Sequence, residues 1–318
     1  MAVYTQVSAE ALSAFLARYD VGDLVSAKGI AEGVENSNYL VDTTKGRFIL
    51  TLYEKRVDAG DLPFFLGVLD RLKAAGNRVP PAIADRAGVQ IQMLEGRPAC
   101  LIEFLTGVSV SHPTPAQARH AAEAMGAMHQ ALIGCELKRH NTMGPDNWVA
   151  LFQQCGRDLD RIEPALHDRV KRSLDEILAH WPATLPRAII HADLFPDNVL
   201  MLGDEVTGLI DFYFACTEIR AWDVAVMHGA WSFDSHGENF DRAVGDALVA
   251  GYDTSFGLSA QERAAMPVLA RGACVRFLLT RAWDWLNTPA DALVTRKDPI
   301  AYLRRLDLYE THGADLFA

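Results

Sequence analysis

Three oxygen-bearing side chains near the middle of the chain, Asp193, Asn198 and Asp211, are spaced so that they could share one site. The segment HADLFPDNVL holds the first two in the pattern H-x-D-x-x-x-x-N, and Asp211 follows thirteen residues after Asn198 in GLIDF. An amide and a carboxylate supply hard oxygen ligands, which suit Mg²⁺. Asp193 is then left to accept a proton from a substrate hydroxyl. This is the layout with which kinases transfer a phosphoryl group from ATP.

A short hairpin must bring these side chains together, and the sequence around them predicts one. The runs RAIIH and NVLMLGDEVTGLIDF have the apolar pattern of strands, and Gly203-Asp204 is typical of a two-residue hairpin turn. Adjacent strands place Asn198 and Asp211 close together. The alternative is that each acid only caps a turn, because Asp and Asn are favoured there. The combination of strand, H-x-D, second strand and returning Asp-Phe favours the functional interpretation.

The N-terminal part of the chain predicts an antiparallel sheet with one inserted helix. SAKGIAEG, NSNYLVDT and RFILTLYE are strand patterns, and GVQIQML with PACLIEFL predicts another hairpin. Residues 58–75 have apolar positions at helical spacing and end before Gly76, a residue typical of the position after a helix. Ser8 predicts the N-cap of an earlier helix.

From about Pro115 the pattern changes to long helices, interrupted by the strands around the acidic cluster. AQARHAAEAMGAMHQAL and DRVKRSLDEILAHW are helical patterns, and helical spacing resumes from about Trp222. We therefore predict an α+β fold with two lobes. The smaller N-lobe, residues 1–104, is an antiparallel β-rich unit, and the larger C-lobe, residues 105–318, is mainly helical. Proteins of this kind commonly bind their ligand between the lobes.

Composition and charge exclude several classes of function. The 318 residues carry a net charge of -11, so no Lys/Arg-rich face for nucleic acid is expected. No run approaches the roughly 18 apolar residues that a membrane span needs, and the N-terminal segment lacks the pattern of a signal peptide. The five cysteines are scattered and odd in number, which is typical of reduced thiols. We predict a cytoplasmic protein that acts on a small molecule, and the sequence leaves the oligomeric state open.

Several segments resemble the aminoglycoside phosphotransferase and choline kinase family, whose fold is protein-kinase-like. They are GVENSNYLVDTTKGRFILTLYEKR, LIEFLTG, HADLFPDNVL, IDFYFACTEIRAWDVAV and RFLLTRAWDW, which together span nearly the whole chain. The resemblance implies dependence on ATP and Mg²⁺. It assigns Asp193 as the catalytic residue, Asn198 and Asp211 as metal ligands, Asp223 as a brace of the catalytic loop and His191 as a residue that orients it. A simple helix cap is the alternative for Asp223.

The same resemblance implies a nucleotide site on the N-lobe. The hairpin GVENSNYLV resembles the nucleotide-covering loop, and the segment between the lobes resembles the linker that offers backbone groups to adenine. The residues implied in binding ATP are Gly33, Asn36, Ser37, Asn38, Lys55, Glu103 and Leu105. An ordinary turn and a plain strand are the alternatives, because the hairpin lacks the full G-x-G-x-x-G.

Two departures from the protein-kinase pattern narrow the function. Thr51 stands where those kinases carry a strand lysine, and the following helix offers no partner Glu, so Lys55 or Arg56 is the candidate cation for the phosphates. Ala192 replaces the arginine that pairs with a phosphorylated activation loop, and no D-F-G or A-P-E occurs. We therefore predict a kinase of small molecules.

The acceptor that the resemblance implies is L-homoserine, with choline, methylthioribose or an aminoglycoside as alternatives in the same family. Homoserine is a zwitterion, so its binding site needs an Arg for the carboxylate and an acidic or carbonyl group for the ammonium. The residues expected in the substrate site are Asp193, Tyr213, Arg276, Arg281 and Asp284. A local salt bridge is the alternative for Arg281 and Asp284. A regulatory nucleotide-binding protein without catalysis and a metal-dependent phosphoesterase are the other functions left open.

Overall fold

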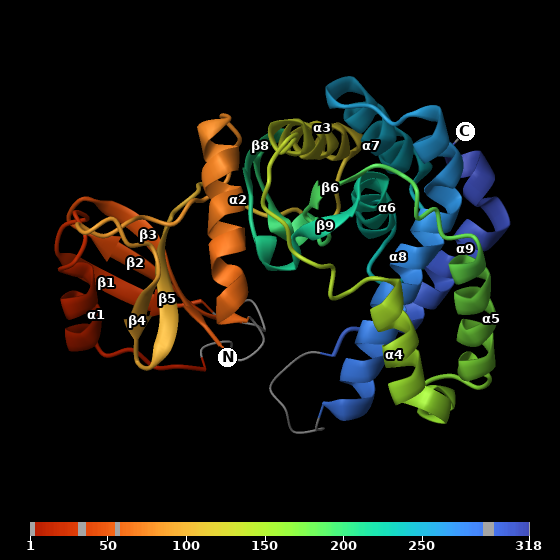
Figure 1. Ribbon diagram of the computed structural model, residues 1–318, viewed down its shortest axis with the longest axis horizontal. Helices are drawn as coiled ribbons and strands as arrows, with labels where there is room; N and C mark the ends of the chain where they lie inside the picture. Colours follow the sequence, from red (N-terminus) through yellow and green to blue (C-terminus); the bar gives the residue numbers. More distant parts are fainter. Residues whose placement is uncertain (1–3, 31–35, 55–57, 289–295, 318) are drawn as a thin grey trace. The chain divides into compact units, whose positions relative to one another are not determined.

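The computed structural model describes residues 4–30, 36–54, 58–288 and 296–317 (Figure 1). The chain divides into two compact units, Met1–Thr106 and Gly107–Ala318, where the sequence predicted a boundary between residues 104 and 105.

The first unit is built on the predicted antiparallel sheet. Its strands lie in the order β1-β2-β3-β5-β4. Their bounds are β1 Leu24–Gly29, β2 Asn36–Thr43, β3 Gly46–Tyr53, β4 Gln92–Leu94 and β5 Arg97–Glu103. Leu12 and Phe15 of α1 (Ala9–Leu16) pack with Val41 and Leu50 of the sheet in one buried cluster. Ser8 caps α1, and α2 (Leu62–Ala74) ends before Gly76, so both predicted helices are confirmed.

The second unit is mainly helical, as predicted. Its helices are α3 Pro115–Ala131, α4 Pro145–Cys155, α5 Leu166–Ala179, α6 Arg220–Trp231, α7 Arg242–Ser255, α8 Ala260–Asn287 and α9 Ile300–Leu316. The long helix α8 lies against α4, α5, α6 and α9, while α3 packs on α7 (Figure 1). Side chains of α8 therefore reach the middle of this unit. None of the helices in the described ranges combines the length and the apolar character needed to cross a membrane.

Two small antiparallel sheets interrupt the helices. β7 (Val199–Leu202) and β8 (Glu205–Leu209) form the predicted hairpin around Gly203, whose φ of 62° suits the turn. β6 (Arg187–Ile190) pairs with β9 (Cys216–Ile219), a strand that the sequence analysis did not predict. β9 has only four residues, and it includes the buried Glu218, so it lacks a recognisable strand pattern.

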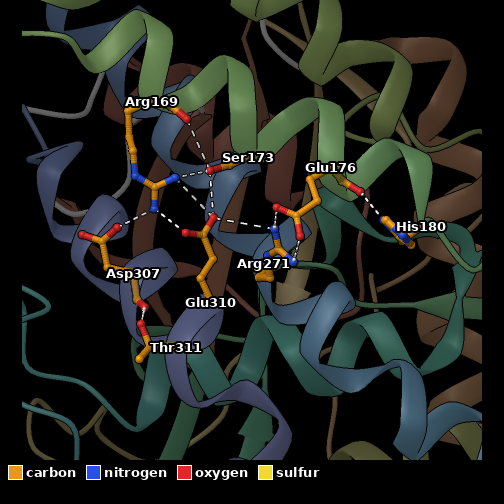
Figure 2. A network of polar contacts seen from close by, with 8 residues as sticks. All are labelled: Arg169, Ser173, Glu176, His180, Arg271, Asp307, Glu310 and Thr311. Carbon is orange, nitrogen blue, oxygen red and sulfur yellow. Dashed lines mark hydrogen bonds and ion pairs between the residues drawn. The ribbon is translucent and has the colours of Figure 1, made fainter.

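A polar network ties α8 to α5 and α9 away from these sheets (Figure 2). Arg271 of α8 lies 2.9 Å from Glu176 of α5 and 3.7 Å from Glu310 of α9. Glu310 in turn accepts the Ser173 hydroxyl of α5 at 2.8 Å and pairs with Arg169. The carboxylate of Glu310 thus joins α9 to both α5 and α8.

Candidate active site

Two loops of the second unit lie side by side because the small sheets hold both of their ends. One loop, residues 191–198, runs from β6 to β7, and the other, residues 210–215, runs from β8 to β9. β6 pairs with β9 at one end of the loops, and β7 pairs with β8 at the other. The antiparallel ladders therefore bring the predicted catalytic segment against the segment that carries Asp211.

Asn198 and Asp211 occupy neighbouring backbone positions where the loops meet. The Ile210 N–H donates to the Asn198 carbonyl oxygen at 3.0 Å, which extends the β7–β8 ladder and places Asp211 next in line. Asp211 has a φ of 64°, a left-handed conformation that is uncommon outside glycine. Strand pairing thus brings together the two residues that the sequence predicted as metal ligands.

The donor set at this position fits Mg²⁺. The Asn198 side-chain nitrogen donates to the Asp193 carbonyl oxygen at 2.7 Å, so its amide oxygen is the atom suited to bind a cation. The Asp211 carboxylate adds further hard oxygen, the ligand type that Mg²⁺ takes. Within the described ranges no group of three or more His, Cys, Asp and Glu residues could hold a metal by itself. An ion here would take its remaining ligands from nucleotide and water.

A buried carboxylate, Asp223 of α6, holds the beginning of the predicted catalytic loop, residues 191–198. Its oxygens accept the backbone N–H groups of His191 and Ala192, each at 2.8 Å, and Oδ2 also lies 3.1 Å from Nε2 of His129 on α3. Burial alone would raise the pKa of Asp223, but the hydrogen bond from His129 and the other donors outweigh it and lower that pKa. The loop is therefore fixed to an ionised carboxylate by charge-assisted hydrogen bonds.

His191 links the two loops as a neutral ring. Its Nε2 lies 2.9 Å from the Ile210 carbonyl oxygen, which can only accept, and its Nδ1 accepts the Asp193 N–H at 3.3 Å. One ring nitrogen thus carries the proton and the other a lone pair. Burial lowers the pKa of His191, which keeps the ring uncharged. Both nitrogens are engaged in orienting the loop.

Side chains from distant elements also hold the carbonyl groups of the loop. Trp231 at the end of α6 donates from Nε1 to the Leu194 carbonyl oxygen at 2.9 Å. Asn198 holds the carbonyl of Asp193 in the same way. The peptide groups from residue 191 to 194 are therefore fixed in space by side chains before any ligand binds.

Arg276 of α8, which the sequence analysis expected in the substrate site, lies against the backbone of the catalytic loop. It is 2% exposed, and its Nη1 donates to the Ala192 carbonyl oxygen. Its Nη2 lies 3.6 Å from Oδ1 of Asp193. A guanidinium enclosed in this way presents little surface to an acceptor, and the contact of Arg276 with an acceptor stays a prediction.

The side chain of Asp193 is partly exposed, although both of its oxygens have a neighbour: Arg276 Nη2 lies 3.6 Å from Oδ1, and Asn198 Nδ2 lies 3.4 Å from Oδ2. The Asp193 side chain is 20% exposed. Burial raises the pKa of the Asp193 carboxyl, and the positive charges of Arg276 and Lys297 limit the rise. A partly exposed carboxylate of raised proton affinity is suited to accept a proton from a hydroxyl group.

Lys297, which no sequence motif singled out, adds a cation beside the catalytic loop. Its Nζ lies 5.9 Å from the centre of the Phe195 ring, two residues beyond Asp193. The next residue, Asp298, offers its carbonyl oxygen to Nη1 of Arg281 at 3.2 Å. The chain thus brings Lys297 and Arg281 together, although Lys297 lies in the short segment before α9, where periodicity gives no signal.

The other two residues expected in the substrate site lie near Asp211 and Arg281 in the sequence. Tyr213 belongs to the short 3₁₀ turn Phe212–Phe214 that follows Asp211. Asp284 lies on α8, three residues after Arg281. Their contact with an acceptor stays a prediction.

The polar residues expected to bind the nucleotide are strand residues at the start of β2. Ser37 is buried, and its hydroxyl donates to Glu54 at 2.7 Å. Asn38 accepts the hydroxyl of the buried Thr51, the residue at the position of the kinase lysine, at 2.8 Å. Asn36 is also buried. Because these side chains are engaged within the sheet, a contribution to nucleotide binding would come from their backbone.

The remaining nucleotide-binding expectations are only partly described. Glu103 ends β5, and its carboxylate pairs with Lys73 of α2 at 2.8 Å. Leu105 follows β5 and is half-buried. The predicted positions outside the described residues are Gly33, Lys55 and Arg56. Binding of ATP by these residues stays a prediction.

Comparison with known proteins places this site in a family context. A family model described as the phosphotransferase enzyme family matches residues 26–266. A homoserine kinase of Zymomonas mobilis is 53% identical over 311 residues, which cover 97% of this chain and 97% of that protein. A homoserine kinase of Gluconacetobacter diazotrophicus is 52% identical over 308 residues, which cover 96% of each chain.

Solved structures show the same fold at low sequence identity. An amicoumacin kinase in complex with AMP-PNP and Ca²⁺ has a TM-score of 0.73 at 15% identity, covering 96% of this chain and 94% of that chain. A spectinomycin phosphotransferase in complex with ADP and spectinomycin has a TM-score of 0.73 at 13% identity, covering 98% and 100%. The predicted α+β, protein-kinase-like fold is therefore confirmed.

Proposed function

The chain belongs to the phosphotransferase enzyme family, and we propose that it transfers the γ-phosphoryl group of ATP to the hydroxyl of L-homoserine. The full-length identity to homoserine kinases carries this proposal. The arrangement of Asp193, Asn198 and Asp211 supports it, because each has the chemistry that the reaction needs where the two loops meet. Use of ATP follows from the family, and Mg²⁺ at Asn198 and Asp211 is part of the proposal.

The role of the protein in this reaction is mainly positioning and electrostatics. Phosphoryl transfer has a loose transition state that needs little covalent chemistry from the enzyme. Asp193 orients the acceptor hydroxyl and accepts its proton on its partly exposed carboxylate. Asn198 and Asp211 would hold Mg²⁺, which would supply positive charge beside the phosphates. The hydrogen-bonded loop keeps these groups in place.

The acceptor carboxylate requires a cation near the hydroxyl site, and Arg281 and Lys297 supply two. Both interact electrostatically with Asp193: Lys297 limits the rise of the Asp193 pKa, and Asp193 opposes the lowering of the Arg281 pKa by burial. In extended homoserine the hydroxyl oxygen and the carboxylate carbon are roughly 5 Å apart. A hydroxyl at Asp193 therefore leaves the carboxylate in the region of these cations.

Turnover with purified protein tests the function and separates it from the alternatives. We expect ATP consumption with L-homoserine and little with choline, methylthioribose or an aminoglycoside. Turnover with another alcohol but none with homoserine would contradict the substrate assignment and keep the phosphotransferase class. ATP binding without turnover on any acceptor would support the regulatory alternative, which the intact Asp193, Asn198 and Asp211 disfavour. Hydrolysis of phosphoesters without ATP would support a phosphoesterase.

Carboxylate recognition is tested with 3-aminopropan-1-ol, which is homoserine without its carboxylate. Arg281→Met and Lys297→Met should each lower kcat/KM for homoserine by about tenfold to a hundredfold, the value of a hydrogen bond to a charged group. They should change kcat/KM for 3-aminopropan-1-ol by less than about threefold. Arg296→Met is the matched control, because the Arg296 guanidinium binds the Trp285 carbonyl. Equal losses on both acceptors would show that the two cations do not bind the carboxylate.

A further inference from the structure

Ala192, the residue before the catalytic Asp193, has a strained backbone. Its φ of 66° lies in the left-handed region, which a residue with a Cβ rarely adopts. Such a conformation persists only where the surrounding structure enforces it. Because Asp193 follows directly, the turn at Ala192 sets the direction in which the catalytic carboxylate leaves the chain.

Two buried charged side chains hold Ala192 from opposite ends of its backbone. Its N–H donates to Oδ1 of Asp223 on α6 at 2.8 Å, and its carbonyl oxygen accepts from Nη1 of Arg276 on α8. Ala192 is 1% exposed, and both charged residues are buried. The strained residue is thus fixed by an anion on its donor and a cation on its acceptor, each carried by a rigid helix.

The surroundings of Arg276 indicate that its charge serves the loop. The guanidinium carbon lies 5.4 Å from the Phe214 ring, 5.7 Å from that of Trp222 and 4.4 Å from that of Phe277. Its Nε has no hydrogen-bond partner among the described residues. A buried charge with incomplete pairing is costly, and an apolar side chain would fill such a position at least as stably. Stability alone therefore does not account for an arginine here.

We propose that Arg276 is a positioning residue that, together with Asp223, clamps Ala192 in the left-handed conformation and so aims Asp193 at the acceptor hydroxyl. The proposal rests on the phosphotransferase function inferred above. Arg276 supplies from α8 a guanidinium that the loop itself lacks at residue 192, where protein kinases carry an arginine. Its task differs, because it binds the backbone of the loop rather than a phosphorylated segment.

The clamp is tested with Arg276→Met and with Ala192→Gly as a second-site change. Arg276→Met should lower kcat about a hundredfold and change KM for ATP and for the acceptor by less than about threefold, because the loss is one of orientation. Glycine adopts a positive φ without the penalty of a Cβ. Ala192→Gly should therefore raise the kcat of the Arg276→Met protein about tenfold.

A conservative variant and a matched control complete the experiment. Arg276→Lys keeps a cationic donor for the Ala192 carbonyl, so it should recover part of the lost kcat. Arg271→Met on the same helix removes a charge from the network of Figure 2 and should lower the unfolding midpoint without changing kcat. If Arg276→Met does not fold, the comparison of Arg276→Lys with and without Ala192→Gly replaces it.

Three results would overturn the clamp. They are a kcat for Arg276→Met within threefold of the parent, an absence of rescue by Ala192→Gly, and a loss confined to the acceptor KM. The last would mean that Arg276 binds the acceptor itself, as its sequence position first suggested. A parent enzyme that phosphorylates a different acceptor would contradict the homoserine proposal alone, because the clamp can be measured with any acceptor.

Discussion

Replacing Asp223 with asparagine should destabilise the protein strongly, although the change alters only one atom of the side chain and its charge. Asp223 is fully buried and accepts three hydrogen bonds, from the backbone N–H groups of His191 and Ala192 and from Nε2 of His129. An asparagine has one acceptor oxygen where the carboxylate has two. Its amide nitrogen must therefore face at least one of these donors.

The size of the effect follows from the better of the two amide orientations. With its oxygen at the position of Oδ2, the asparagine keeps the bonds from His191 and His129 and presents a donor to the Ala192 N–H. Leaving that N–H unpaired costs about 1–3 kcal/mol. The two remaining bonds lose the charge of their acceptor and weaken by about 1 kcal/mol each. Asp223→Asn should thus lower the free energy of unfolding by about 3–5 kcal/mol, a large part of the roughly 5–15 kcal/mol of a typical protein.

Urea unfolding of the parent and the variant, followed by circular dichroism at pH 7.5, measures this difference. The midpoint should fall without a large change in the slope m. Asp246→Asn is the matched control, because Asp246 is exposed and pairs with Arg242 across one helical turn, so its loss should cost less than about 0.5 kcal/mol. A destabilisation below about 1 kcal/mol for Asp223→Asn would refute the view that an ionised Asp223 anchors the loop.

Three other substitutions probe single features of the molecule. Burial lowers the pKa of His228 from 6.5 to about 3, so the unfolded chain binds a proton there that the folded chain does not, and stability falls as pH drops below 6.5. His228→Gln should reduce this loss of stability by up to about 1.4 kcal/mol per pH unit in urea titrations at pH 6 and 5. An unchanged pH dependence would contradict a lowered pKa of His228 in the folded protein. Asp211→Asn should raise the Mg²⁺ concentration for half-maximal activity at least about tenfold in an assay at fixed ATP, and an unchanged value would exclude Asp211 as a ligand. Trp231→Phe, which removes the bond to the Leu194 carbonyl, should cost about 1 kcal/mol in the unfolding free energy, whereas a neutral effect would show that this bond does not support the loop.

Local patterns in the sequence predicted the elements that carry the site. The apolar runs and the Gly203-Asp204 turn predicted the β7–β8 hairpin, and a two-residue turn fixes the pairing of Leu202 with Glu205 and of Met201 with Val206. Between Met201 and Leu200 the register shifts by one residue, which the sequence did not predict, and the ladder then continues to Asn198 and Ile210 beside Asp211. The proximity of Asn198 and Asp211 was predictable because it depends on contacts between near neighbours in the chain.

Contacts between distant residues were not predictable in the same way. The sequence placed Arg276 on a helix, but its hydrogen-bond partner Ala192 lies 84 residues earlier and belongs to an irregular turn. β9 escaped notice because a strand of four residues with a buried Glu218 becomes recognisable only beside its partner β6. Lys297 likewise depends on a chain path that brings the segment before α9 to Phe195.

The most direct test of the account is the product formed from ATP and L-homoserine by the parent enzyme and by Asp193→Asn. With Mg²⁺ present, the parent should convert homoserine to O-phospho-L-homoserine, as identified by mass spectrometry. Asp193→Asn should lower kcat by at least about a thousandfold and keep ATP affinity and unfolding midpoint close to the parent values, because Asp193 lies at the accessible edge of a loop that other residues hold. Formation of O-phospho-L-homoserine by Asp193→Asn at more than about a tenth of the parent rate, or none by the parent itself, would contradict the account.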